Sequence, residues 1–172
     1  MIELNNYPRD LKWRAIETKA GSMAVAYNDD GVYALEFPGS HQVTNKVQAK
    51  DPQWLKQLAD DLQAYFLGRQ VSFTCPLVVA DYPPFFRKVL GVVAEIPYGE
   101  CRSYSWVATR ANSPQAARAV GQAMSRNRTP LLIPCHRVVC KDGSLGGFGY
   151  GLVWKQKLLQ LEQQTAGRTF NG

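Results

Sequence analysis

The stretch SYSWVATRANSPQAARAVGQA, residues 103–123, decides the architecture of the second half of the chain. Ser103 is a favourable N-cap for a short helix over residues 104–110, and Pro114 suits the first turn of a second helix over residues 114–125. Only about three residues separate the two helices. Two short helices joined so tightly are typical of a helix-turn-helix.

The flanking sequence extends this arrangement in both directions. Apolar residues recur on one face over residues 85–96 and again over residues 152–162, and each pattern predicts a helix. Before the last helix, Asp142-Gly143 indicates a turn. A helix-turn-helix followed by a hairpin predicts a winged-helix-like arrangement.

The first half of the chain has a different pattern. Turns at Gly21 and at Asp29-Asp30-Gly31 separate three short apolar runs, which indicates hairpins and a small antiparallel sheet. The predicted strands are residues 12–20, 22–28 and 32–37.

A helix is predicted after this sheet, over residues 51–67. Asp51 is its expected cap, Pro52 takes its first position, and Gly68 follows its end. Apolar residues at 3.6-residue spacing give the helix one face that can be buried against the sheet.

The boundary between the halves lies in a proline-rich segment. Residues 71–74 predict one more strand, and residues 76–84 predict a linker. The predicted fold class is therefore α/β (α+β). A small N-terminal domain of antiparallel sheet and helix covers residues 1–80, and a helical, winged-helix-like domain covers residues 81–172.

Charge is distributed unevenly between the halves. Residues 1–81 carry 8 Lys and Arg against 10 Asp and Glu, a net charge of −2, whereas residues 82–172 carry 12 against 4, a net charge of +8. A basic surface gains affinity for an anionic polymer by releasing its counterions. A solvated basic surface without a partner is the alternative interpretation.

The composition of the 172 residues argues against several classes of protein. No apolar run approaches the ~20 residues needed to cross a bilayer. The opening MIELNNYPRDLKWR has no apolar core for a secretory signal, so we expect a cytoplasmic protein, or a nuclear one if the cell has a nucleus. Four cysteines without a CxxC pair, and only His41 and His136, predict free thiols and no metal site.

The second helix of the pair has an unusual surface. Arg118 is the one long cation among small residues such as Ala117, Ala119 and Gly121. Major-groove readers usually carry several polar side chains, whereas a smooth helix suits the minor groove, which is only about 6 Å wide. Arg118 would then fill the gap left by an extruded base. The alternative is a tightly packed helix with one surface arginine.

The segment IPCHRV, residues 133–138, contains the candidate nucleophile. A thiol attacks only as the thiolate, and a free cysteine with a pKa of about 8.5 is mostly protonated at neutral pH. His136 is a candidate acceptor for the proton of Cys135. Neighbours in an extended segment point to opposite faces, so the imidazole would reach the sulfur through a bend or a bridging water. The other three thiols are assigned structural positions: Cys75, Cys101 and Cys140.

A series of short motifs runs through the second half in a fixed order. They are Pro84-Phe85, Ile96-Pro97-Tyr98-Gly99, Ser103-Tyr104, Ala116-Ala117-Arg118-Ala119-Val120-Gly121, Asn127, Pro134-Cys135-His136-Arg137-Val138, Gly151-Leu152, Lys155, and Leu158-Leu159 ahead of Glu162. Together they resemble the O6-alkylguanine-DNA alkyltransferases, also called methylated-DNA–protein-cysteine methyltransferases. The first 80 residues resemble that family only in layout, and they lack the histidines with which several relatives bind zinc.

The resemblance implies a role for each matching residue. Cys135 would be the alkyl acceptor, with His136 and a bridging water as its base and Glu162 orienting the imidazole. Arg118 would replace the flipped nucleotide. Asn127 would hold the active-site segment. Tyr104 would crowd the phosphate and donate toward guanine N3, and Lys155 would polarise that phenol. The remaining implied contacts are with DNA by Ala117, Ala119 and Gly121, with the guanine edge by backbone groups of Cys135 and Val138, and with the substrate in a pocket lined by Pro130, Val138, Gly149 and Tyr150.

The resemblance also implies the reaction. The protein would flip an O6-alkylguanine, mainly O6-methylguanine and with O4-alkylthymine as a further candidate, out of duplex DNA. It would transfer the alkyl group to its own cysteine in a single-turnover SN2 step, because the thioether product resists hydrolysis. No cofactor and no metal are implied. The expected partner is the minor groove of double-stranded DNA, and the expected state is a monomer away from membranes.

Two other functions are open on the residues alone. A protein that flips damaged bases without chemistry would carry a residue other than cysteine, commonly Trp, at position 135. A Cys-His hydrolase or acyl transferase would leave Arg118 and the basic half unexplained. Tyr150 bears on substrate size, since bulk at the pocket rim predicts poorer handling of benzyl than of methyl adducts, unless the ring points to solvent.

Overall fold

Three strands form an antiparallel sheet in the order β1 (Lys12–Thr18), β2 (Gly21–Asn28) and β3 (Gly31–Glu36). Its register pairs Arg14 with Val25 and Val25 with Leu35. The central strand β2 is buried over most of its length, so the sheet contributes residues to the core from both faces. The predicted strands and the turns between them are confirmed to within two residues.

The computed structural model describes residues 7–40 and 42–167. These residues group into two compact units that divide between Val79 and Ala80. We call them the N-terminal unit and the C-terminal unit. His41 and the first six residues of the opening segment lie outside the described residues.

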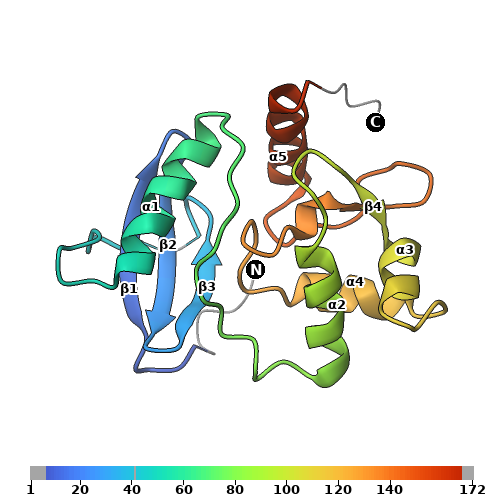
Figure 1. Cartoon of the computed structure of the whole chain (residues 1–172), viewed down its shortest axis with the longest axis horizontal. Helices are drawn as coiled ribbons and strands as arrows, with labels where there is room; N and C mark the ends of the chain where they lie inside the picture. Colours follow the sequence, from blue (N-terminus) through green and yellow to red (C-terminus); the bar gives the residue numbers. More distant parts are fainter. Residues whose placement is uncertain (1–6, 41, 168–172) are drawn as a thin grey trace. The chain divides into compact units, whose positions relative to one another are not determined.

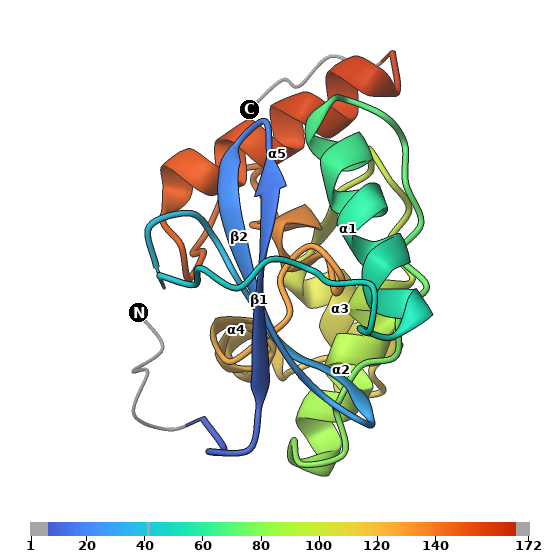
Figure 2. The same cartoon turned by 90° about the vertical axis from the view of Figure 1, so that its left-hand side faces the viewer.

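Helix α1 (Gln53–Phe66) lies across one face of the sheet (Figures 1 and 2). Its buried side includes Leu55, Leu58 and Leu62, as the apolar spacing predicts. The expected cap at Asp51 is wrong, because no side chain caps this helix. Both oxygens of Asp51 are instead taken by an ion pair with Arg14.

The strand predicted over residues 71–74 is also wrong, because this segment has no strand pairing. Its Phe73 ring packs near Tyr65 of α1, with 5.9 Å between the ring centroids, so the segment follows the helix and not the sheet edge. The chain meets the sheet later, where Leu77 forms a single parallel bridge with Val32.

The C-terminal unit is built on three helices that contact one another: α2 (Pro84–Ala94), α3 (Tyr104–Arg110) and α4 (Ala117–Ser125) (Figure 1). Ser103 caps α3 as predicted, since its Oγ accepts from the backbone N–H of Trp106 at 3.1 Å. The mixed α/β fold class, with a sheet-containing first part and a helical second part, is confirmed. Within the described residues, no helix is long and apolar enough to cross a membrane.

Helix α4 begins three residues later than predicted. The segment around Pro114 forms a turn, which Ala116 N closes by donating to Ser113 O at 2.9 Å. Asn112 precedes it with a φ of 56°, in the left-handed region that asparagine tolerates better than most residues. The loop between the two helices is therefore longer than the sequence indicates.

The hairpin expected after the helix pair is not a regular antiparallel ladder. Instead, β4 (Arg102–Ser103) and β5 (Val138–Val139) form a short parallel pair. The chain then turns at Asp142-Gly143, as predicted, and ends in helix α5 (Leu152–Thr165). The parallel pair joins the start of α3 to the residues that follow Cys135.

Candidate active site

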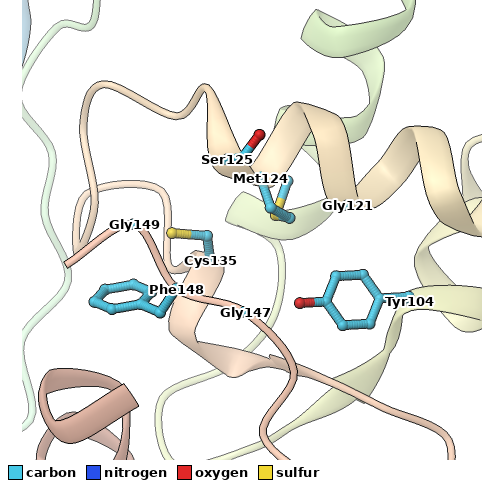
Figure 3. A pocket seen from close by; sticks show the side chains of 8 residues that line it. All are labelled: Tyr104, Gly121, Met124, Ser125, Cys135, Gly147, Phe148 and Gly149. Carbon is cyan, nitrogen blue, oxygen red and sulfur yellow. The ribbon is translucent and has the colours of Figure 1, made fainter. Parts of the chain in front are cut away.

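Cys135 lies at the wall of a pocket of about 300 Å³ in the C-terminal unit. Its side chain is buried but not sealed, with 7% of its surface exposed. Helix α4 supplies part of the wall and the loop before α5 supplies another part (Figure 3). The thiol therefore opens beside the helix of small residues. The lining residues are Tyr104, Gly121, Met124, Ser125, Cys135, Gly147, Phe148 and Gly149.

A tight turn carries the nucleophile. Residues Cys135–Arg137 form a single turn of 3-10 helix, closed by Arg137 N donating to Pro134 O at 2.9 Å. A bend is one of the two expected routes between the imidazole and the sulfur, and the chain does bend here before it becomes extended at Val138–Val139. The bend separates the environments of two neighbours: Cys135 meets the pocket, whereas His136 is completely buried.

Glu162 of α5 holds the imidazole of His136. The His136 Nε2 atom lies 2.7 Å from Glu162 Oε1, and a carboxylate partner favours the tautomer with its proton on Nε2. The other ring nitrogen, Nδ1, is buried without a hydrogen-bond partner in the described part of the chain. Burial lowers the pKa of His136, and the hydrogen bond to Glu162 only partly opposes this. The ring is thus neutral at rest, with an open acceptor atom.

Arg137 completes the network behind the imidazole. Its Nε and Nη2 atoms donate to the two oxygens of Glu162 at 2.9 and 3.0 Å, and its Nη1 donates to Ile96 O at 2.7 Å. The backbone N–H of Gly99 also donates to Glu162. Burial opposes ionisation of this carboxyl, but its hydrogen bonds with His136 and Arg137 hold its pKa well below the usual range.

The thiol itself is not activated at rest. Burial raises the pKa of Cys135 above its ordinary value, and a hydrogen bond with Asn127 and the charge of Lys155 offset this only in part. Cys135 is therefore protonated at neutral pH and needs a base to react. The next residue in the sequence, His136, has an unpaired acceptor atom, Nδ1, that is a candidate for this base.

Asn127 fastens the segment that leads to the nucleophile. Its Nδ2 donates to Ile133 O at 2.9 Å, and its Oδ1 accepts from the backbone N–H of Thr129 at 3.1 Å. Cys135 N donates to the same Ile133 carbonyl at 2.7 Å. One buried side chain thereby links the end of α4 to the backbone of the thiol.

Tyr104 lines the pocket, and the buried Lys155 lies over its ring. The Tyr104 hydroxyl points toward Gly147 (Figure 3), with which it forms a backbone hydrogen bond. Lys155 is fully buried, and its Nζ donates to the carbonyls of Val138 at 2.6 Å and Gly147 at 3.1 Å. This ammonium lies 5.9 Å from the centroid of the Tyr104 ring, so it contacts the ring face while it donates to backbone carbonyls.

A glycine permits this arrangement. Gly146 has a φ of 65°, and a Cβ placed there would lie 2.9 Å from the Tyr104 hydroxyl and 3.3 Å from the Cys140 sulfur. A side chain at this position would force the Tyr104 phenol to shift, and the positive φ would be strained.

Two family models together match most of the chain. Residues 11–79 match the ribonuclease-like domain, and residues 84–164 the DNA-binding domain, of the 6-O-methylguanine DNA methyltransferases. The curated methylated-DNA–protein-cysteine methyltransferase of Methanosarcina barkeri is 37% identical over 86% of this chain and 94% of its own length. The chain belongs to the methylated-DNA–protein-cysteine methyltransferase family.

Other family members extend the similarity. The constitutive methylated-DNA–protein-cysteine methyltransferase of Bacillus subtilis is 35% identical over 86% of this chain and 92% of its own. Among solved structures, the Mycobacterium tuberculosis OGT in complex with DNA aligns with a TM-score of 0.77 and 33% identity. That alignment covers 89% of this chain and 93% of the other.

Against this family background, helix α4 has the exposed face that the sequence suggests. Arg118 is exposed and forms no ion pair with another described residue. Ala117, Ala119 and Gly121 are only half-buried, so the helix presents backbone and small side chains to solvent around the arginine. Gly121 also lines the pocket, which places the open face of α4 next to Cys135.

The structure brings only part of the predicted substrate pocket to this cavity. Of its four expected residues only Gly149 lines the cavity. Val138 is fully buried and turns its carbonyl to Lys155, and Pro130 is buried too. Tyr150 lies against Phe148, with 6.1 Å between the ring centroids, so Phe148 takes the wall position.

Sequence reasoning also missed several residues of the site. Met124, Ser125, Gly147 and Phe148 line the pocket, and Arg137 holds Glu162. Arg137 is part of the Pro134–Val138 signature, so the sequence contains a signal that could have identified it as a partner of Glu162. The four cysteines are free thiols, and the described residues contain no group of three or more His, Cys, Asp and Glu that could hold a metal ion.

Proposed function

We propose that this protein repairs O6-alkylguanine in double-stranded DNA by transferring the alkyl group to Cys135. The observation that carries the proposal is a thiol at the wall of a pocket beside α4, backed by the buried His136–Glu162–Arg137 network. The relatives named above are methylated-DNA–protein-cysteine methyltransferases, and the family membership supports the same reaction here.

The chemistry requires one proton transfer and one substitution. His136 Nδ1 takes the thiol proton through an intervening water, and the thiolate attacks the alkyl carbon. The new C–S bond forms as the C–O6 bond breaks, and the electron pair moves into the purine. A proton at guanine N3 makes the base a better leaving group. The thioether product is stable, so each molecule acts once.

The surrounding residues position the two reactants. Asn127 holds the backbone of Cys135 through Ile133, and Tyr104 supplies the proton to N3. Lys155 donates to the carbonyl of Gly147, and the backbone of Gly147 is hydrogen-bonded to the Tyr104 hydroxyl. The cation therefore acts on the phenol in two ways, through Gly147 and directly across the face of the ring. Alignment of this kind matters because a misplacement of about 1 Å can cost about a hundredfold in rate.

DNA is bound through the C-terminal unit in this proposal. The open face of α4 enters the minor groove, and Arg118 takes the place of the extruded nucleotide. The net charge of +8 on residues 82–172 attracts the phosphate backbone. The N-terminal unit has a structural role, and the protein acts as a monomer. Because its substrate is DNA, we infer that it works where the cell keeps DNA, which is the cytoplasm in a cell without a nucleus.

Mass spectrometry after incubation with duplex DNA that contains O6-methylguanine tests the main proposal. We expect one added methyl on Cys135 and none on Cys140, which does not line the pocket. Cys135→Ser should abolish transfer while DNA binding persists, and Cys140→Ser should transfer normally. A Cys135→Ser protein that still becomes methylated, or a wild-type protein that binds methylated DNA and is never modified, would refute the proposal.

A second experiment tests the role of Arg118. Arg118→Ala should slow repair of duplex DNA far more than transfer from a free-base analogue, because only the duplex has a gap to fill. Lys157→Ala on α5 is a matched control for the loss of one exposed cation. Equal losses of Arg118→Ala with both substrates would remove the finger assignment.

The size of the adduct that the pocket accepts depends on the wall that Phe148 forms. We infer that Tyr150 limits bulky adducts indirectly, by packing against Phe148. Tyr150→Gly should therefore increase the rate with O6-benzylguanine and leave the rate with the methyl substrate unchanged. No gain on the benzyl substrate would mean that the tyrosine has no influence on the pocket.

A further inference from the structure

The segment between α4 and the nucleophile is held from two sides. Asn127 holds it from inside, through Thr129 and Ile133. On the outside, the buried hydroxyl of Tyr82 donates to Arg126 O at 3.0 Å and accepts from Arg128 N at 2.8 Å. These two backbone groups belong to the residues on either side of Asn127. The hydroxyl of Tyr82 therefore fixes the backbone position from which Asn127 reaches inward.

The side chain of Arg128 locks this contact in place. Its Nη1 and Nη2 atoms each donate to one carboxylate oxygen of Asp81 at 2.7 Å, in a two-pronged ion pair. The guanidinium also stacks over the Tyr82 ring, 4.2 Å from its centroid. We call Asp81, Tyr82 and Arg128 the outer clasp. It joins the residues just before α2 to the residues just after α4.

The segment held this way is under backbone strain. Leu131 has a φ of 71°, in the left-handed region that residues with a Cβ avoid, and its side chain is buried. Such a conformation persists only where the surrounding structure over-determines it. Leu131 lies between Asn127 and Cys135, so a loosened segment could relax and move the thiol.

We propose that Tyr82 is a positioning residue for the alkyl transfer, acting on Cys135 through Asn127. Each link is a hydrogen bond: from Tyr82 to the backbone around Asn127, from the Asn127 side chain to Ile133 O, and from Cys135 N to the same carbonyl. The outer clasp holds Tyr82 in the position from which this series of hydrogen bonds starts. The inference rests on the proposed function, since its readout is transfer to Cys135.

Tyr82→Phe tests the inference because it removes only the hydroxyl. We expect the single-turnover rate constant at saturating methylated duplex to fall about fivefold, because roughly 1 kcal/mol for a lost hydrogen bond corresponds to about fivefold at 1.4 kcal/mol per tenfold. The affinity for duplex DNA should not change, because Tyr82 is buried. Transfer from free O6-methylguanine should slow by the same factor, because the thiol itself is displaced.

The stoichiometric reaction separates positioning from folding. The endpoint of methylation counts the active molecules, whereas the rate constant does not depend on their number. Tyr65→Phe, which removes a phenol hydroxyl from a fully buried side chain in the N-terminal unit, should leave the rate constant unchanged. Arg128→Lys keeps the backbone N–H and the charge but not the two-pronged pair, so it should give a smaller loss than Tyr82→Phe.

A double-mutant cycle with Asn127→Ser decides whether the effect passes through Asn127. We expect Tyr82→Phe to add little once Asn127 is replaced. Multiplicative losses would overturn the inference, as would a Tyr82→Phe protein with the wild-type rate constant. If wild-type protein transfers no methyl group at all, the proposed function fails first, and that outcome differs from a normal wild type with an unaffected variant.

Discussion

Each unit of the protein buries a carboxylate against an arginine, and the two clusters differ in whether a buried polar atom beside them lacks a hydrogen bond. In the N-terminal unit, Asp51 accepts from Arg14 twice at 2.8 Å, from the Tyr27 hydroxyl and from Gln48 N. In the C-terminal unit, Glu162 accepts from Arg137 twice, from Gly99 N and from the imidazole of His136.

The difference lies in the partner beyond the carboxylate. Within the described residues, no side-chain atom of the Asp51 cluster is buried without a hydrogen bond, whereas His136 Nδ1 is. Buried polar atoms are nearly always paired, so an exception calls for an explanation. A clamped carboxylate alone is a structural feature. The same feature with an unpaired acceptor on the residue that follows a pocket thiol is a candidate catalytic base.

The largest expected effect separates the two carboxylates directly. Glu162→Gln should lower the transfer rate constant by about a thousandfold, because the imidazole loses the partner that fixes its tautomer. Asp51→Asn should leave that rate constant within about twofold of wild type. Breaking one side of a buried ion pair costs roughly 3–5 kcal/mol, so both variants should unfold at lower temperature. Single-turnover kinetics and thermal unfolding measure the two quantities.

Similar slowing in both variants would abolish the distinction between the clusters. Glu162→Asp serves as a second variant in case the first is too unstable to purify. It keeps the charge but shortens the reach to His136, so it should fold better and still transfer slowly. Rate constants rather than yields must be compared, because an unstable variant also loses active molecules.

A pH profile gives the next largest effect. Burial lowers the pKa of His136 from its ordinary value of about 6.5, so the imidazole stays neutral even at a pH somewhat below that value. The wild-type rate constant should therefore be flat through neutral pH and fall only in acid, where the base becomes protonated. Burial raises the pKa of Cys135, so in His136→Gln the rate should rise about tenfold per pH unit through neutrality, following the rare thiolate.

Asp51→Asn is the control for this profile and should reproduce the wild-type curve. A flat profile in His136→Gln would mean that another group removes the thiol proton. A wild-type rate that falls already above pH 7 would mean that the imidazole is charged at rest, against the direction that its burial dictates.

Much of this architecture follows from local sequence. Ser103 predicts the start of α3 because a cap is satisfied within three residues, and the strands follow from alternation and turns. The exceptions depend on distant partners. Asp51 is a good cap by its sequence position, but Arg14, remote in sequence, takes its carboxylate. Pro114 suits a helix start, but the chain closes a turn there first.

The candidate site divides in the same way. The signature around Cys135 identifies the thiol and its neighbours, and the family resemblance supplies Glu162. Phe148 and Met124 line the pocket only because a loop and α4 come together, which no local pattern reports. Tyr82 and Arg128 meet across more than 40 residues of chain, at a separation of 46 positions. Hydrogen bonds over such a span are a property of the tertiary fold.

The smallest expected effect comes from the arginines. Arg137→Lys and Arg14→Lys each keep the charge and lose the planar two-pronged contact, so each should destabilise its cluster. Only Arg137→Lys should also slow transfer, by a few-fold, because Glu162 then holds His136 less firmly. In the other cluster, the hydrogen bond with Arg14 lowers the pKa of Asp51 from 3.8 to about 2, although burial opposes this.

That shift gives Arg14→Lys a signature in acid. The folded pKa of Asp51 is depressed, so its stabilisation is complete above pH 3.8 and is lost as the pH falls toward 2. Weakening the pair raises the folded pKa toward 3.8, and acid unfolding of Arg14→Lys should begin at higher pH than in wild type. Its transfer rate constant at neutral pH should stay unchanged. A slowed transfer in Arg14→Lys would mean that the structural cluster also acts on the thiol, and the contrast between the two carboxylates would no longer hold.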